Sequence, residues 1–430
     1  MLTALIGFLG LLAIAFLGFP LGLSMLLTGF IGVGVLRGWE PALETVSQQI
    51  IDVTLNTNFA VLPMFLLMGA FVYRAALSDD LYDCANAWFG HFKGGLALAT
   101  VAACGGFSAI SGSSAATAAT MAKVAVPSMR RFNYADSIAA GTVAAGGTMG
   151  FLIPPSAALI VYGILTEESI AELFIAGILP GALTIAVYMG VIAIIARVRP
   201  ELCPPGNRAS WAQRWMSLYK VWAVMALFLL ILGGISFGMF TPNEAGGIGA
   251  IGALAFAVGR RRMTWRIMFD AILEAAHTTA MIFTIIIGAL VLNNFVILSG
   301  LSAGMVEWID SLSFSPIVII LIILGFYVLL GTVIEGLAMI FLTVPIFVPI
   351  VEGLGFDLVW FGIVMVMVVE ISLITPPIGL NVFVLKSMLP DVPLSTIFRG
   401  IMPFFAADIV RLLLVVFFPG IALFLPSVLS

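Results

Sequence analysis

Apolar stretches that can each cross a lipid bilayer recur along the whole chain and constrain its fold more than any other feature. A helix needs about 20 apolar residues to span the hydrocarbon core. The stretches do not alternate between apolar and polar residues as the strands of a membrane barrel do, so we expect helices throughout. They lie near 2–19, 21–36, 58–76, 95–126, 138–165, 171–196, 219–239, 243–259, 272–298, 316–350, 358–389 and 401–427.

The composition excludes several other classes of protein. Only 9% of the residues are charged and 62% are hydrophobic, whereas roughly a quarter of a soluble domain is charged. A soluble enzyme, a secreted disulfide scaffold, a disordered regulator and a nucleic-acid-binding protein are therefore excluded. The three cysteines and two histidines lack the spacing of metal ligands, and no convincing catalytic set supports a membrane-embedded enzyme.

Four prolines of the first half have a counterpart in the second half at one fixed offset in residue number. In each pair the two residue numbers differ by the same amount as those of Pro20 and Pro242, so no insertion or deletion shifts one pair against another. The chain has 21 prolines in all. We therefore predict two structural repeats, 1–200 and 218–430, joined by a cytoplasmic linker at 201–217. The pairs are Pro20 and Pro242, Pro127 and Pro349, Pro154 and Pro376, and Pro155 and Pro377.

Two apolar stretches in each half are unusual for simple spans. Stretches 95–126 and 316–350 exceed one span and carry small or polar residues in their middle. Stretches 138–165 and 358–389 are each interrupted by a Pro-Pro pair. We expect the first kind to form re-entrant helical hairpins, which turn back inside the membrane, and the second kind to form broken helices.

The distribution of charge predicts the orientation of the chain. Short cytoplasmic loops are enriched in Lys and Arg, and the loops on the opposite side hold only Arg37 as a base beside acids such as Glu307 and Asp310. If both hairpins turn back without crossing, the two repeats have opposite topology, which is typical of secondary transporters, and both termini are periplasmic. Sixteen of the 18 basic residues lie in or beside 74–93, 123–131, 197–220, 260–266 and 386–399.

The middle of the first hairpin, Ser108–Thr117, is rich in Ser, Gly and Ala. An unwound tip would point the carbonyls of one half-helix at a cation and the amides of the next at an anion. Close packing of small residues in a membrane bundle is the alternative. The Pro-Pro breaks free further carbonyls, and irregular backbone at membrane depth is tolerated where it lines a cavity. Carbonyls and hydroxyls suit a hard cation such as Na⁺, and a simple structural kink is the alternative.

A few ionisable residues lie inside apolar stretches. The offset of the proline pairs relates Glu335 to Ser113. We expect Glu335 to be a cation ligand, a proton carrier or a hydrogen-bonded structural acid. The same three roles are open for Glu370. Asp408 and Arg411 lie one helical turn apart. We expect them to neutralise each other or to contact a partner subunit.

Connectors with apolar residues at helical spacing, at 40–55, 211–218 and 263–275, are expected either to lie as helices at the membrane interface or to be ordinary amphipathic loops.

Four segments together resemble the large membrane subunit of tripartite ATP-independent periplasmic (TRAP) transporters. The resemblance covers essentially the whole chain and implies an all-α polytopic membrane protein with an elevator-type fold akin to the divalent-anion/sodium symporters. The chain differs from the usual motif of this family at Asn243 and Gly246-Gly247, and we expect these differences to affect packing only. The segments read GGFSAISGSSAATA at 105–118, GFLIPPS at 150–156, FTPNEAG at 240–246 and TPPIGLN at 375–381.

The resemblance implies a division of labour between two groups of helices. A scaffold would hold the first three spans of each repeat and its last span, and a moving domain would hold the hairpins and the broken helices. The implied function is Na⁺-coupled uptake of an organic acid across a bacterial or archaeal cytoplasmic membrane. The implied partners are a small four-helix membrane subunit and a periplasmic substrate-binding protein.

The resemblance also implies site residues. One Na⁺ would lie at each junction of a hairpin tip with a helix break, and the substrate carboxylate would lie between the tips. The alternative is a stand-alone Na⁺- or H⁺-coupled organic-anion symporter. The implied Na⁺ ligands are Ser111, Ser113, Gly150, Ile153 and Pro155 at the first junction and Gly331, Thr332, Ser372, Thr375 and Pro377 at the second. The implied substrate residues are Ser114, Thr117, Thr148, Ser156 and Asn381, with Glu335 as a possible ionisable coupling residue.

Overall fold

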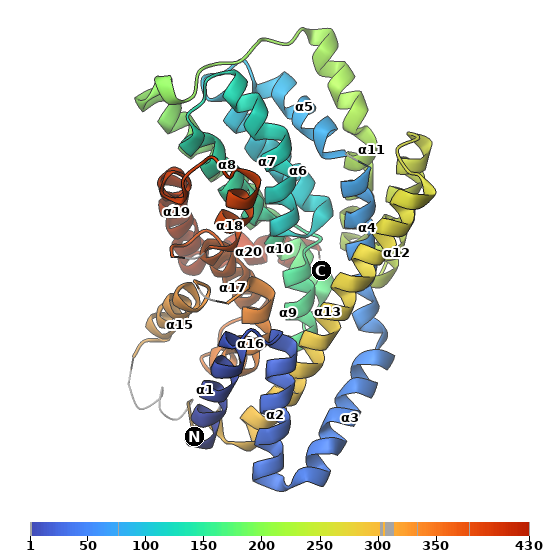
Figure 1. The fold of residues 1–430 in the computed structure, drawn as a ribbon, viewed down its shortest axis with the longest axis vertical. Coiled ribbons are helices and arrows are strands. Elements are labelled where there is room, and N and C mark those ends of the chain that lie inside the picture. Colours follow the sequence, from blue (N-terminus) through green and yellow to red (C-terminus); the bar gives the residue numbers. More distant parts are fainter. Residues whose placement is uncertain are drawn as a thin grey trace.

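The computed structural model describes residues 2–75, 77–301, 304–305, 314–332, 334–377 and 379–429. This part of the chain is helical, as expected from its apolar stretches (Figure 1). Six of the described helices are long and apolar enough to cross a membrane. Most of the acidic loop 299–315, including Glu307 and Asp310, lies outside the described residues.

One group of helices, here called the scaffold group, is built around a long central helix, α13. Helices α2 and α4 pack along α13, and α12 packs along α4 (Figure 1). Glycine permits the closest of these contacts, because a Cβ atom at Gly29 would lie 2.6 Å from the backbone nitrogen of Leu292 in α13. The scaffold group comprises α1 (Leu2–Phe16), α2 (Leu21–Arg37), α3 (Trp39–Leu55), the 3₁₀ turn η1 (Thr57–Ala60), α4 (Val61–Arg74), α11 (Trp211–Ser236), α12 (Pro242–Gly259) and α13 (Trp265–Leu298).

The remaining long helices form a second group, here called the hairpin group. Helix α5 (Leu77–Phe89) connects the two groups and packs against both α6 and α11. The hairpin group comprises α6 (Gly95–Ser111), α7 (Ser114–Arg131), α8 (Asp136–Thr148), the 3₁₀ turn η2 (Met149–Phe151), α9 (Ala157–Thr166), α10 (Ile170–Val198), α15 (Pro316–Leu330), α16 (Gly336–Gly353), α17 (Leu358–Ser372), α18 (Leu380–Met388), α19 (Leu394–Phe417) and α20 (Gly420–Leu429).

The last span of each repeat packs with the hairpin group in this structure, whereas the family resemblance implies that it belongs to the scaffold. Helix α19 packs along α8, and α10 packs against α6, α9, α17 and α19, all of which belong to the hairpin group. Glycine explains the first contact, because a Cβ atom at Gly400 of α19 would lie 1.8 Å from the carbonyl oxygen of Ser137 in α8. A pair of helices in backbone contact packs as one unit.

Helix boundaries recur at the offset found for the prolines. The offset relates both ends of α16 to the ends of α7, and it relates the start of α17 to the start of α8. Both Pro-Pro bonds, Pro154-Pro155 and Pro376-Pro377, are cis. The inverted relation of the two repeats and the division at 201–217 remain predictions.

The expected interface helices differ between the two halves. Segment 40–55 is a separate helix, α3, which ends where Asn56 accepts a hydrogen bond from the backbone of Asn58 at 2.9 Å and begins η1. Segments 211–218 and 263–275 are instead the first turns of the continuous helices α11 and α13. These segments are thus helical rather than loops, and they continue into longer helices because no Pro or Gly follows either segment to break the helix.

The FTPNEAG segment begins α12. Thr241 and Glu244 form a capping box, in which Glu244 accepts a hydrogen bond from the Thr241 backbone at 2.9 Å. Proline at the first helical position suits such a start. Asn243, which differs from the residue usual in the family at this position, donates to the carbonyl of Thr57 at 2.9 Å and thereby connects α12 to η1.

Candidate functional site

Hairpin 1, formed by α6 and α7, turns at only two residues. Gly112 has φ +58°, a left-handed conformation that glycine adopts without strain. Ser113 then begins α7, and its hydroxyl accepts a hydrogen bond from the backbone of Ala116 at 3.4 Å. The carbonyl end of α6 and the amide end of α7 therefore meet at one point, as the sequence predicts.

The tip of hairpin 1 is in backbone contact with the break between α8 and α9. A Cβ atom at Gly150 would lie 2.7 Å from the carbonyl carbon of Ser113, and one at Gly112 would lie 3.0 Å from the carbonyl oxygen of Pro155. The structure thus brings together Ser111, Ser113, Gly150 and Pro155 from two segments. The side chain of Ile153 packs toward Gly181 of α10, where a Cβ atom would lie 3.1 Å away.

The second hairpin, formed by α15 and α16, meets the second break in the same way. A Cβ atom at Gly331 would lie 2.2 Å from the Cβ atom of Ser372, so only glycine fits there. The hydroxyls of Thr332, Ser372 and Thr375 each donate to a carbonyl about one turn earlier, in α15 for Thr332 and in α17 for the other two, at 2.7, 2.6 and 2.6 Å. Pro377 is exposed, whereas Val333 and Ile378 lie outside the described residues.

Glu335 lies at the second tip and begins α16. Its carboxylate accepts a hydrogen bond from the backbone of Ala338 at 3.1 Å. A negative charge at a helix N-terminus is stabilised by the helix dipole. Of the three options for Glu335, this geometry matches the hydrogen-bonded acid.

The five implied substrate residues are engaged with the protein itself in this conformation. Ser114 donates to the side chain of Asn381 at 2.9 Å, and both are buried. Thr117 donates to the Ser113 carbonyl at 2.8 Å, and Thr148 donates to the Ala145 carbonyl at 2.8 Å. Ser156 caps α9 and accepts from the backbone of Leu159 at 3.3 Å.

A cavity of about 210 Å³ lies between the tip of hairpin 1 and the scaffold group, and it is here called the polar cavity because hydroxyl and carboxylate side chains form part of its lining. Ser111 and Ser113 line one side, and Tyr73 of α4 with Glu274 and Thr278 of α13 line the other. No local sequence signal marks these three scaffold residues, because they come from helices distant in the chain.

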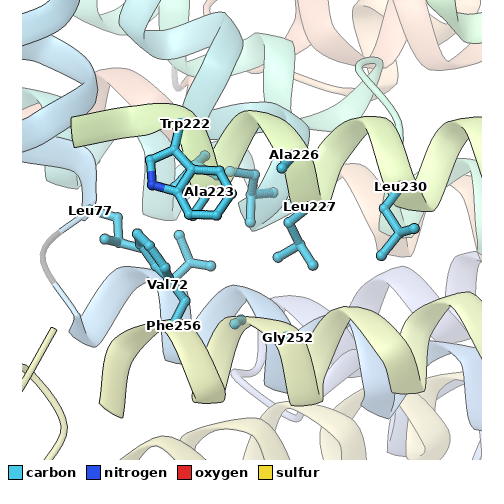
Figure 2. Close-up of a pocket in the computed structure, with 12 residues that line it drawn as sticks. Val72, Leu77, Trp222, Ala223, Ala226, Leu227, Leu230, Gly252 and Phe256 are labelled. Atoms are coloured by element: carbon cyan, nitrogen blue, oxygen red, sulfur yellow. The ribbon is translucent and has the colours of Figure 1, made fainter. Parts of the chain in front are cut away.

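A second cavity, of about 420 Å³, contrasts with the first. It is lined by apolar side chains of α4, α11 and α12, including Val72, Trp222, Leu227 and Phe256 (Figure 2). An apolar lining of this kind suits hydrocarbon better than an ion or a carboxylate. The polar cavity at hairpin 1 is therefore the better candidate for a path to the site.

Three charged residues inside the bundle form a cluster, here called the charge cluster: Glu370 of α17 with Asp408 and Arg411 of α19. All three are fully buried. Arg411 Nη2 lies 2.8 Å from Glu370 Oε2 and 3.1 Å from Asp408 Oδ1. The expected Asp408–Arg411 pair is thus present, but Arg411 is shared with a second carboxylate.

Two helices of the hairpin group complete the surroundings of the charge cluster. Tyr188 of α10 donates to Asp408 Oδ2 at 2.7 Å, and its hydroxyl lies 3.5 Å from that of Thr148 at the end of α8. Arg411 Nη1 donates to the hydroxyl of Thr184, also on α10. The cluster therefore links both broken helices to α10 and α19.

Comparison with solved structures supports the fold. The chain superimposes on the Alcanivorax borkumensis YdaH transporter with a TM-score of 0.61 over 89% of each chain, at 16% identity. The Neisseria gonorrhoeae MtrF structure gives a TM-score of 0.54 over 88% of this chain and 84% of that one, at 12% identity. At such low identity the likeness concerns the fold alone.

Comparison with curated sequences is more specific. The chain is 36% identical to the C4-dicarboxylate TRAP transporter large permease DctM of Pseudomonas aeruginosa, covering 95% of this chain and 93% of that protein. It is 31% identical to the sialic acid permease SiaM of Vibrio cholerae (99% and 98% covered) and 32% identical to the ectoine/5-hydroxyectoine permease UehC of Ruegeria pomeroyi (97% of each). These relatives are permeases, not enzymes.

The family described as "Tripartite ATP-independent periplasmic transporter, DctM component" matches residues 8–421. Together with relatives above 30% identity over nearly their whole length, this match settles the family. The chain belongs to the DctM family, the large membrane permease subunits of TRAP transporters.

Proposed function

We propose that this permease couples the inward movement of Na⁺ to the import of an organic acid. The observation that carries the proposal is the backbone contact between the tip of hairpin 1 and the break at Gly150. Helix ends, hydroxyls and backbone carbonyls converge there without a charged side chain among Ser111, Ser113, Gly150 and Pro155. Such oxygen donors suit a hard, weakly coordinated cation.

The substrate in this proposal is an organic acid bound close to the cation. The names of relatives specify C4-dicarboxylates and sialic acid, and those of others specify ectoines. The amide end of α7 favours a carboxylate by its dipole. A bound anion and a bound cation then raise each other's affinity, by about 1–3 kcal/mol if the coupling is typical.

The partners and the transport cycle follow the family resemblance. We place the basic loops in the cytoplasm and both termini in the periplasm, and we assign the chain a periplasmic substrate-binding protein and a small four-helix membrane subunit. Helix α5 is the principal covalent connection from α4 to hairpin 1. In an elevator cycle the hairpin group moves past the scaffold group, and the polar cavity beside Ser111 and Ser113 opens or closes with it.

Replacing Ser113 with alanine should remove most of the stabilisation by sodium. A ligand that binds only the folded state at 100 times its Kd stabilises that state by about 2.7 kcal/mol. We expect NaCl, but not choline chloride or KCl, to raise the unfolding temperature of the purified wild type in detergent. We expect this rise to be largely lost in Ser113→Ala.

A matched control separates a lost ligand from a lost helix cap. Ser169 begins α10 as Ser113 begins α7, and its hydroxyl accepts from the backbone of Glu172 at 3.3 Å. Each substitution removes a cap worth about 1 kcal/mol. Ser169→Ala should therefore lower the unfolding temperature while keeping the full response to sodium. An equal response to sodium in the two variants would contradict the first Na⁺ site.

A further inference from the structure

The charge cluster holds two carboxylates but one guanidinium. Both ion pairs of Glu370 and Asp408 found in the described part of the chain are made with Arg411. Glu370 Oε1 has no hydrogen-bond partner among the described residues although it is buried. With both carboxylates ionised the cluster carries a net charge of −1, and Tyr188, the other titratable group in contact with it, adds a hydrogen bond but no positive charge.

The cluster lies beside both helix breaks. Glu370 is two residues before Ser372, which contacts the tip of the second hairpin at Gly331. Thr148, which reaches the cluster through Tyr188, is two residues before Gly150 at the first tip. Two residues of helix correspond to about 3 Å of rise, so Glu370 lies about half a turn from the second junction and Thr148 about half a turn from the first.

An unbalanced charge in a low-dielectric interior is costly, and a cation held nearby reduces that cost. The attraction acts at a distance, because buried charges are weakly screened. A unit charge roughly 10 Å away in a medium of effective dielectric about 20 changes the affinity of an ion by roughly tenfold. The cluster can therefore govern the affinity of a cation site without touching the cation.

We propose that the charge cluster is the electrostatic determinant of cation affinity at the hairpin–break junctions. When both are ionised, Glu370 and Asp408 supply the attracting charge, and Arg411 holds them in place and limits their excess negative charge to one. The hydroxyls and carbonyls of the tips and breaks remain the ligands. This inference rests on the proposed coupling to Na⁺. It states that residues that do not bind the cation themselves determine how tightly it is bound.

The inference predicts two opposite effects of Glu370→Gln. Without sodium the variant should be as stable as the wild type or more stable, because it leaves a neutral Arg411–Asp408 pair. The sodium concentration that gives half of the maximal thermal stabilisation should rise roughly tenfold. We would measure unfolding temperature against NaCl, with choline chloride holding the ionic strength constant. Asp408→Asn, which retains an acceptor for Tyr188, should shift the half-saturating sodium concentration in the same direction.

The control removes one negative charge far from the cluster. Glu201 is exposed in the linker between the two halves, so Glu201→Gln should leave the sodium dependence unchanged. If the cluster is merely structural, Glu370→Gln should be less stable with and without sodium, and its half-saturating sodium concentration should equal that of the wild type. That result would overturn this inference but not the proposed Na⁺ coupling. A wild type that shows no sodium-specific stabilisation would overturn the proposed Na⁺ coupling and the inference together.

Discussion

Arg411→Met is expected to lower the free energy of unfolding by about 3–5 kcal/mol, the usual cost of removing one partner from a buried ion pair. Glu370 and Asp408 would then face each other in the bundle interior without a counter-charge. The Thr184 hydroxyl would also lose its donor. The effect is measured by thermal unfolding of the purified protein in detergent, with the fraction that remains monodisperse as the readout.

Two further variants test the cause of that loss. Arg399 is exposed near the start of the same helix, α19, so Arg399→Met should change stability little. Adding Glu370→Gln and Asp408→Asn to Arg411→Met neutralises the whole cluster and should restore a large part of the stability, since neutral replacements of buried ion pairs are often tolerated. If Arg411→Met unfolds at the same temperature as Arg399→Met, the cluster does not stabilise the fold.

Gly400→Leu is expected to separate α19 from α8 and to destabilise the hairpin group by about 3 kcal/mol or more, at or beyond the upper end of overpacking costs. A Cβ atom at Gly400 would lie 1.8 Å from the carbonyl oxygen of Ser137, which is backbone and cannot turn aside. On the facing helix a Cβ atom at Gly141 would lie 2.4 Å from the carbonyl carbon of Gly400. The measurement is again thermal unfolding in detergent.

Gly190→Leu is the matched control, because Gly190 also lies inside a long helix, α10, but has no heavy atom within 4 Å of an added Cβ. It should change the unfolding temperature by far less than Gly400→Leu. Equal effects of the two substitutions would mean that the contact between α8 and α19 does not determine the loss.

Local sequence signals located the hairpin tip and the helix breaks well. A glycine followed by a serine ends one helix and begins the next, and the structure turns at Gly112 and Ser113 accordingly. Ser156 after the Pro-Pro pair likewise begins α9. These features depend on a few neighbouring residues, which is why pattern and capping chemistry suffice to predict them.

Contacts between distant segments could not be predicted in this way. The sequence indicated the Asp408–Arg411 pair from its spacing, but not the contact of Arg411 with Glu370, 41 residues away, or of Tyr188 with Asp408, 220 residues away. The scaffold side of the polar cavity was missed for the same reason. Three ionisable residues in otherwise apolar spans were the available clue, since such residues seldom remain unpaired in a bundle.

The difference between the two halves at α3, α4 and α13 has a mechanical consequence. The first half has a joint at Asn56 and η1, whereas the equivalent stretch of the second half is one helix of 34 residues. A helix of that length is a rod of about 51 Å. Hairpin 1 rests against the jointed side, where a Cβ atom at Gly69 of α4 would lie 3.0 Å from the carbonyl oxygen of Ser111, and α16 rests against the rod. If the hairpin group moves as proposed, the first half would follow it by bending at Asn56 and η1, whereas α16 would slide along the continuous helix α13.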